Sequence, residues 1–289
     1  MDIFEQADAF TPSRAVLQEE EEAAAPSASG FLRPAVCVWN KGLVGRLFPK
    51  GLSCRVLVVA TCPTSAALLA ALPGKQLIGT VLAPGVSLAG TSLPAPGSGP
   101  LPSDRVCCVY SLPGPDGPEA GALLVVCQYG VARERCSAWA RAVLSQMSYG
   151  HAVFLGAMAA EQFRGQGDAS QESLLFSLAT KAAQQRRTEQ GGAPSAPPLP
   201  TGSLVGGLPA ALLSHCQVRG QSAELLVTVE MVMEGRAAAA EALAGALAAA
   251  LGGSSGVPAA AEALRTPGVR AAARRALGVG AGAQADVYA

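Results

Sequence analysis

One stretch of the sequence is apolar at every position, and it constrains the fold more than any other. Residues 122–127 read Ala, Leu, Leu, Val, Val and Cys, without the alternation of a strand that faces water on one side. Such a strand is covered on both faces, as in a sheet with helices packed above and below it. The sequence therefore predicts a helix-flanked sheet.

Further apolar runs of strand length are separated by turn residues. The predicted strands are residues 35–39, 55–61, 76–82, 105–112, 121–129, 151–158 and 223–233. A helix at residues 133–147, with apolar residues at helical spacing, lies between two of these strands, and a strand, helix, strand unit predicts a parallel pair. We expect an α/β fold with a mostly parallel sheet flanked by helices on both faces, in three α/β/α layers and a single domain.

Capping signals and apolar spacing predict further helices. Asp168 and Gln171, three residues apart, are typical of a helix N-terminus. Pro209 is tolerated only in a first helical turn, so another helix is expected to begin near Leu208. The additional predicted helices are residues 168–187, 208–217, 236–251 and 267–278.

The chain is expected to have three segments. Residues 1–30 end in four consecutive glutamates followed by Ala, Pro and Ser, a composition typical of a disordered acidic tail. Residues 31–278 are expected to form the α/β domain. Its loops, rich in Pro, Gly and Ser, are expected at residues 91–104, 113–120 and 190–203. Residues 279–289 are expected to be a flexible tail, since glycines alternate with other residues from Gly278 onward.

Charge and hydropathy argue against several classes of protein. Lysine plus arginine and aspartate plus glutamate number 21 each, without a large basic cluster, so no nucleic acid is expected as a partner. The acidic first residues are unlike a targeting peptide, which makes the cytosol the expected location. Residues 237–251, the most apolar segment, contain Glu241 and are fewer than the roughly 20 needed to span a bilayer, so no membrane is expected.

Cysteine and histidine usage argues against a metal site. Most of the eight cysteines lie in apolar runs or on apolar helix faces, where we expect reduced core residues. The sequence has no Cys-x-x-Cys pair and only two histidines, His151 and His215. The glycines of residues 278–282 follow a helix and not a strand, which does not fit a dinucleotide-binding loop. Neither a metal nor a cofactor is therefore expected.

The last three residues bring together groups that a partner could recognise. Val287 is apolar, Tyr288 offers a ring and a hydroxyl, and Ala289 carries the free carboxylate, which is charged at neutral pH. Capture of such an end in a pocket is a known recognition mode. We therefore interpret Val287, Tyr288 and Ala289 as partner-binding residues, with a frayed terminus without function as the alternative.

An enzymatic alternative rests on Cys127 and Arg133. Residues 127–133 match the Cys-x-x-Gly-x-x-Arg spacing of cysteine phosphatase loops, in which backbone N–H groups and a guanidinium hold phosphate. Val126 stands where such loops carry a histidine, and Glu134 where they carry a hydroxyl residue. A core cysteine is the favoured interpretation, and a phosphatase or another α/β small-molecule enzyme stays open as the alternative.

Several stretches, taken together, resemble the proteasome assembly chaperone 1 family, and most closely its plant and algal members. They are residues 77–85, 128–136, 163–165, 199–203, 207–218 and 286–289. The resemblance runs from about residue 35 to the end, and residues 207–218 and the terminal residues are its most specific parts.

This resemblance implies a non-enzymatic factor, without catalytic residues, in the cytoplasm and also in the nucleus. It implies a heterodimer with proteasome assembly chaperone 2 that binds the proteasome alpha subunits while the core particle is assembled. It also implies that Val287, Tyr288 and Ala289 match the family's hydrophobic-Tyr-X tail. That tail docks between neighbouring alpha subunits, where its carboxylate meets a lysine.

Overall fold

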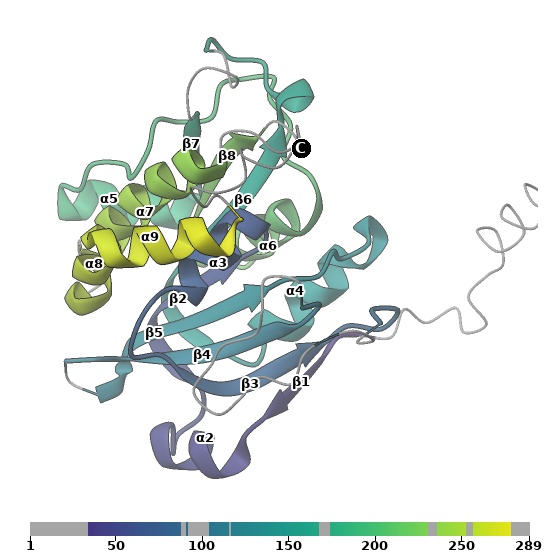
Figure 1. Cartoon of the computed structure of the whole chain (residues 1–289), viewed down its shortest axis with the longest axis vertical. Coiled ribbons are helices and arrows are strands. Elements are labelled where there is room, and N and C mark those ends of the chain that lie inside the picture. The colour runs from purple at the N-terminus through teal and green to yellow at the C-terminus, as the bar shows by residue number, and fades with distance from the viewer. Residues whose placement is uncertain are drawn as a thin grey trace, which may run out of the picture. The chain divides into compact units, whose positions relative to one another are not determined.

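A computed structural model describes residues 34–87, 91, 104–115, 117–167, 174–230, 236–252 and 257–278. Within these ranges the chain forms one eight-stranded sheet in the order β1-β3-β4-β5-β2-β6-β8-β7 (Figure 1). The strands are β1 (Val36–Trp39), β2 (Ser53–Ala60), β3 (Gln76–Leu82), β4 (Cys107–Gly114), β5 (Gly117–Cys127), β6 (Ser148–Ala159), β7 (Leu175–Ala179) and β8 (Ala223–Glu230).

The centre of this sheet is parallel. Strands β5, β2, β6 and β8 lie side by side and run in the same direction. Strands β1, β3 and β4 on one side, and β7 on the other, pair with their neighbours in antiparallel fashion. The sheet is therefore mixed around a parallel core, and the predicted α/β class is confirmed.

Helices cover both faces of the sheet (Figure 1). They are α2 (Lys41–Leu47), α3 (Pro63–Ala70), α4 (Cys136–Leu144), α5 (Lys181–Gln190), α6 (Gly207–Val218), α7 (Arg236–Gly252), α8 (Pro258–Arg265) and α9 (Pro267–Ala276), with the short 3-10 helices η2 (Arg133–Arg135) and η3 (Ala160–Gln162). Helices α3, α7, α8 and α9 pack on one face, and α4 and α6 pack on the other. The sheet thus separates two hydrophobic clusters.

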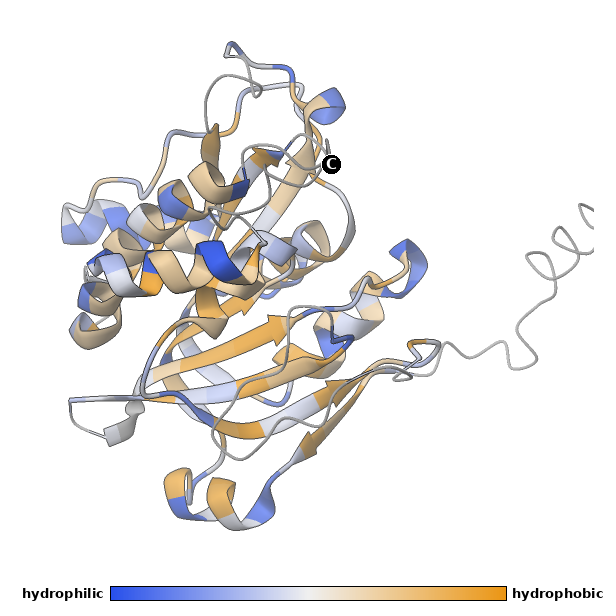
Figure 2. Ribbon diagram, in the orientation of Figure 1, coloured by the Kyte–Doolittle hydropathy of each residue, from blue (hydrophilic) through white to orange (hydrophobic). Residues whose placement is uncertain are grey.

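The all-apolar run of β5 is covered as its composition predicts. All residues from Ala122 to Cys127 are buried, and alternate side chains enter the two clusters on opposite faces. The neighbouring strand β2 is buried on both faces in the same way from Val56 to Ala60. Figure 2 shows these central strands as the most continuous hydrophobic region of the ribbon.

The helix predicted for residues 168–187 is wrong at residues 175–179, and its proposed capping pair, Asp168 and Gln171, lies outside the described residues. Residues 175–179 form β7, which pairs with β8, and the helix begins only at Lys181. Thr180 is its N-cap, because its hydroxyl accepts a hydrogen bond from the N–H of Ala183. Strand β7 is held further by stacking of Phe176 on Phe163, with ring centroids 5.2 Å apart. Pairing with β8 therefore makes residues 175–179 a strand where the sequence predicted a helix.

Two other predictions need refinement. The loop expected at 113–120 is shorter, because β4 extends to Gly114 and β5 begins at Gly117. The last helix begins at Pro267 after Thr266 as predicted, but the Thr266 hydroxyl donates backwards to the carbonyl of Ala263 and does not cap α9. Among the helices described, none is long and apolar enough to cross a membrane.

Candidate functional site

The cavity at the carboxyl ends of β2 and β5 is the first place to look for a binding site. Its volume is about 450 Å³, and it is lined by residues 61–63 after β2, residues 127–130 at the end of β5, and residues of α3, α7 and the end of α9. Helix α3 follows β2 and packs on one face, whereas α4 follows β5 and packs on the other. Crevices where the connections diverge in this way are the usual ligand sites of open α/β sheets.

The loop after Cys127 does not have the geometry of a phosphate cradle. The thiol of Cys127 is buried and donates to the carbonyl of Tyr129, with 3.4 Å between sulfur and oxygen. The N–H of Gln128 donates to the carbonyl of Val106 and so extends the strand pairing. Arg133 is exposed and lies outside the residues that line the cavity. The structure therefore does not bring Cys127 and Arg133 together around a common anion site.

The second thiol in the cavity, Cys62, is held in its protonated form. Burial, and then the negative charge of the nearby Glu230 carboxylate, raise the pKa of Cys62 to about 11, although hydrogen bonds from Ser65 and Thr64 offset part of the rise. The sulfur lies 3.1 Å from the hydroxyl oxygen of Ser65, which in turn donates to the carbonyl of Cys62. A thiolate is the nucleophilic form of cysteine, so Cys62 is not an activated nucleophile at neutral pH.

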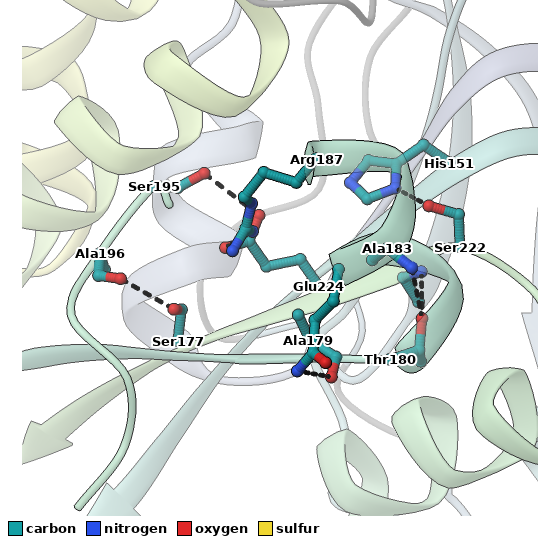
Figure 3. A network of polar contacts seen from close by, with 12 residues as sticks. His151, Ser177, Ala179, Thr180, Ala183, Arg187, Ser195, Ala196, Ser222 and Glu224 are labelled. Carbon is teal, nitrogen blue, oxygen red and sulfur yellow. Dashed lines mark hydrogen bonds and ion pairs between the residues drawn. The ribbon is translucent and has the colours of Figure 1, made fainter. Parts of the chain in front are cut away.

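A polar network at the opposite end of the sheet ties α5 to β8 (Figure 3). The carboxylate of Glu224 is buried and accepts from a guanidinium nitrogen of Arg187 at 2.9 Å and from the Ser195 hydroxyl at 3.1 Å. Both carboxylate oxygens are thus occupied, as the burial of a charge requires. Sequence reasoning missed this network, since its three residues carry no shared motif.

His151 lies beside this network and is bonded to Ser222, with 2.9 Å between Nδ1 and the hydroxyl oxygen (Figure 3). Burial, and then the charges of Arg186 and Arg187, lower the pKa of His151 from 6.5 to about 4. The imidazole is therefore neutral at physiological pH, even though His151 lines a second cavity, of about 280 Å³, beside Arg187 and Glu224.

The low pKa of His151 predicts acid sensitivity. Above pH 6.5 the ring is neutral in the folded and in the unfolded chain. Between pH 6.5 and 4 only the unfolded chain binds the proton, so the free energy of unfolding decreases as the pH is lowered. His151→Asn keeps a hydrogen-bonding group for Ser222 and does not titrate. We expect the loss of unfolding free energy from pH 7.5 to 4.5 to be about 2.5 kcal/mol smaller in this variant than in the wild type.

Urea denaturation at the two pH values measures this difference, with His215→Asn as the control because His215 is less deeply buried than His151. Equal losses in the wild type and in His151→Asn would show that His151 is not the acid-sensitive group.

Exposed apolar side chains gather at one edge of the sheet. Val36 and Val38 on β1, and Leu77 and Leu82 on β3, are each more than 40% exposed. Val36 lies directly opposite Leu82 in the antiparallel pair. Because β1 is the outermost strand of the described sheet, this apolar surface borders an edge that has no strand beyond it among the described residues.

The residues that the sequence singles out as partner-binding, Val287, Tyr288 and Ala289, lie outside the described residues. The description ends at Gly278, just after α9. Ala276 and Leu277, at the end of this helix, border the cavity at the carboxyl ends of β2 and β5.

Comparisons with known proteins identify relatives only at the level of fold. No family model and no curated sequence matches the chain. A Thermoplasma acidophilum protein of unknown function is 13% identical, with a TM-score of 0.55 over 81% of this chain and 88% of its own. Pyrococcus furiosus PbaB, an archaeal proteasome activator, is 14% identical, with a TM-score of 0.55 over 76% of this chain and 89% of its own. These two structures share the fold of this chain.

Proposed function

We propose that this chain is an assembly chaperone of the proteasome core particle, of the proteasome assembly chaperone 1 type found in plants and algae. The observation that carries the proposal is the fold shared with PbaB, an archaeal proteasome activator, over 76% of the chain. The stretches that resemble the chaperone family, residues 207–218 above all, add sequence support to this fold likeness. The expected places of action are the cytoplasm and the nucleus.

The proposed partners are proteasome assembly chaperone 2, in a heterodimer, and the alpha-subunit ring. The exposed apolar residues of β1 and β3 support pairing with another chain, since contiguous exposed apolar patches of this kind mark protein interfaces. The role requires binding and no chemical step. The protonated Cys62 and the separation of Cys127 from Arg133 fit a factor that is not an enzyme.

The proposed anchor on the alpha ring is the C-terminal tripeptide Val287, Tyr288 and Ala289. The eleven residues 279–289 follow the folded body, and fully extended they span at most about 36–40 Å. Burial of the Tyr288 ring contributes roughly 4–6 kcal/mol at about 25 cal/mol per Å². Ordering three residues costs about 1–2 kcal/mol each. The tail is therefore a weak ligand alone, and its contribution depends on the body that holds it near the ring.

Tyr288→Ala is expected to weaken binding to isolated alpha rings by about thirtyfold, because the ring carries most of the buried area and the hydroxyl a hydrogen bond. Adding residues after Ala289 should weaken binding to a similar extent, since it moves the carboxylate away from the lysine that it meets. Ala289→Ser, which keeps the carboxylate in place, is the control and should bind as the wild type does. Surface plasmon resonance with the heterodimer measures all three variants.

Deletion of residues 287–289 separates this proposal from a structural role of the tail. We expect weaker ring binding and an unchanged melting temperature, because the tail is proposed to act outside its own domain. A lower melting temperature with unchanged ring binding would contradict the proposal.

A further inference from the structure

A groove between α4 and α6 carries positive charge without compensation. The two helices pack against each other on one face of the sheet, and the groove between them has a volume of about 420 Å³. Small residues, among them Ser137 and Ser214, form part of its lining. Arg141, His215 and Arg219 supply its charged and titratable groups, and no carboxylate lines it.

The two guanidiniums have no carboxylate partner among the described residues. The ion pairs found there join Arg187 to Glu224 and two other arginines to glutamates, and neither Arg141 nor Arg219 takes part in any of them. The pKa of His215 is lowered by burial and then by Arg219 and Arg141, so both charges act on the imidazole. The groove is thus a local excess of positive charge on a chain whose formal net charge is zero.

An apolar side chain borders this positive charge. Val218, the last residue of α6, lines the groove and is 87% exposed, more than any other large hydrophobic residue in the described ranges. Exposure of the Val218 side chain to water is unfavourable, and contact with an apolar group of a partner would lower the free energy by burying it. The same groove therefore offers two guanidiniums to negatively charged groups and, beside Arg219, the Val218 side chain to an apolar group.

We propose that the groove between α4 and α6 binds an acidic segment of a protein partner, with carboxylates at Arg141 and Arg219 and an apolar side chain on Val218. Charge complementarity selects carboxylates for this site. The groove lacks features typical of nucleic-acid binding, because no phenylalanine, tyrosine or tryptophan lines it for base stacking and its two arginines do not form an extended basic stripe. The proposal does not depend on the proteasome role.

The test uses the full chain and two synthetic peptides labelled with fluorescein. One peptide alternates glutamate and leucine, and the other has glutamine in place of every glutamate. Fluorescence anisotropy at low salt should show that the acidic peptide binds at least about tenfold more tightly than the glutamine peptide.

The double variant Arg141→Gln/Arg219→Gln should lose about tenfold in affinity for the acidic peptide. The control Arg105→Gln/Arg275→Gln removes the same charge at exposed positions elsewhere and should change affinity less than about twofold.

The two histidines give a second readout that a general charge effect would not produce. Arg141 from α4 and Arg219 after α6 are the charged groups that act on His215, so a carboxylate bound between them should raise the pKa of His215. NMR titration of the imidazole protons follows this change, and His151 should keep its pKa. The spectrum of His215→Asn assigns the two resonances.

Three results would overturn the proposal. Equal affinity for the two peptides would remove the role of carboxylates, and equal losses in the groove variant and the control variant would place binding elsewhere. Displacement of the peptide by a single-stranded RNA oligomer that needs the same two arginines would identify nucleic acid as the occupant, against the proposal.

Discussion

Arg187→Met is expected to lower the free energy of unfolding by about 3–5 kcal/mol. The variant removes the guanidinium from Glu224, whose side chain is 3% exposed, and leaves only the Ser195 hydroxyl on a buried carboxylate. Methionine preserves most of the aliphatic packing of the arginine, so the loss reports the charge. Because the side chain of Arg187 itself is 24% exposed, water can replace part of its interaction, and the lower end of the range is the expected one.

The double variant Arg187→Met/Glu224→Gln is the matched control, measured by urea denaturation beside the single variant. With the carboxylate neutralised, no charge stays buried without a partner, and we expect most of the lost stability to return. If the double variant is as unstable as the single one, the loss comes from packing and not from the unpaired carboxylate.

Gly121→Ala is expected to destabilise the fold by about 3 kcal/mol, because a side chain at this position has no space. A Cβ on Gly121 would lie 2.1 Å from the carbonyl oxygen of Leu112 and 2.6 Å from the backbone nitrogen of Gly114. Both atoms belong to the backbone of β4, so no side-chain rotation relieves the contact. The β4–β5 hairpin would have to open, and thermal denaturation should show the change.

Gly130→Ala provides the comparison for this substitution. No atom lies within 4 Å of a Cβ built there, and its backbone does not need the left-handed region that favours glycine. We expect a change of no more than about 0.5 kcal/mol. Equal effects of the two alanines would show that Gly121 is not limited by contact with β4.

The sequence predicted best those elements whose pattern reflects burial directly. The run from Ala122 to Cys127 is apolar on both sides of the strand, and the structure covers it on both sides. The apolar face of α4 is likewise explicit in the spacing of Cys136, Trp139 and Val143, which are all buried. In both cases the local pattern and the tertiary environment agree, which is when pattern reasoning succeeds.

Helix α3 was missed because burial on nearly all sides removes the helical pattern. Six of its eight residues are buried, among them Thr64 and Ser65, so no polar stripe contrasts with an apolar one. Helix α2 was missed for the opposite reason, since none of its seven residues is buried and only the Asn40 cap marks its start. Strand β7 depends on its neighbour β8, which no local pattern shows.

The candidate sites were the least accessible to sequence reasoning. Arg187 and Glu224 are 37 positions apart and meet only because α5 lies over β8. Arg141 lies on α4 and Arg219 directly after α6, and nothing in either segment predicts that they share a groove. The spacing of Cys127 and Arg133 was a local match, but the strand pairing of the intervening Gln128 prevents the expected loop. A site made by segments that are distant in the sequence can be predicted only when the topology of the fold is known.

The strand order has a consequence for the synthesis of this chain. Strand β2 lies at the centre, between β5 and β6, although it is translated before both of them. At about 5–20 residues per second, the ribosome needs several seconds to complete the neighbours of β2. During that time an entirely apolar segment of β2 has no native partner in the sheet. Early cotranslational folding is therefore expected to involve local pieces such as the β4–β5 hairpin, while the apolar segment of β2 stays open to aggregation until β5 and β6 have been made.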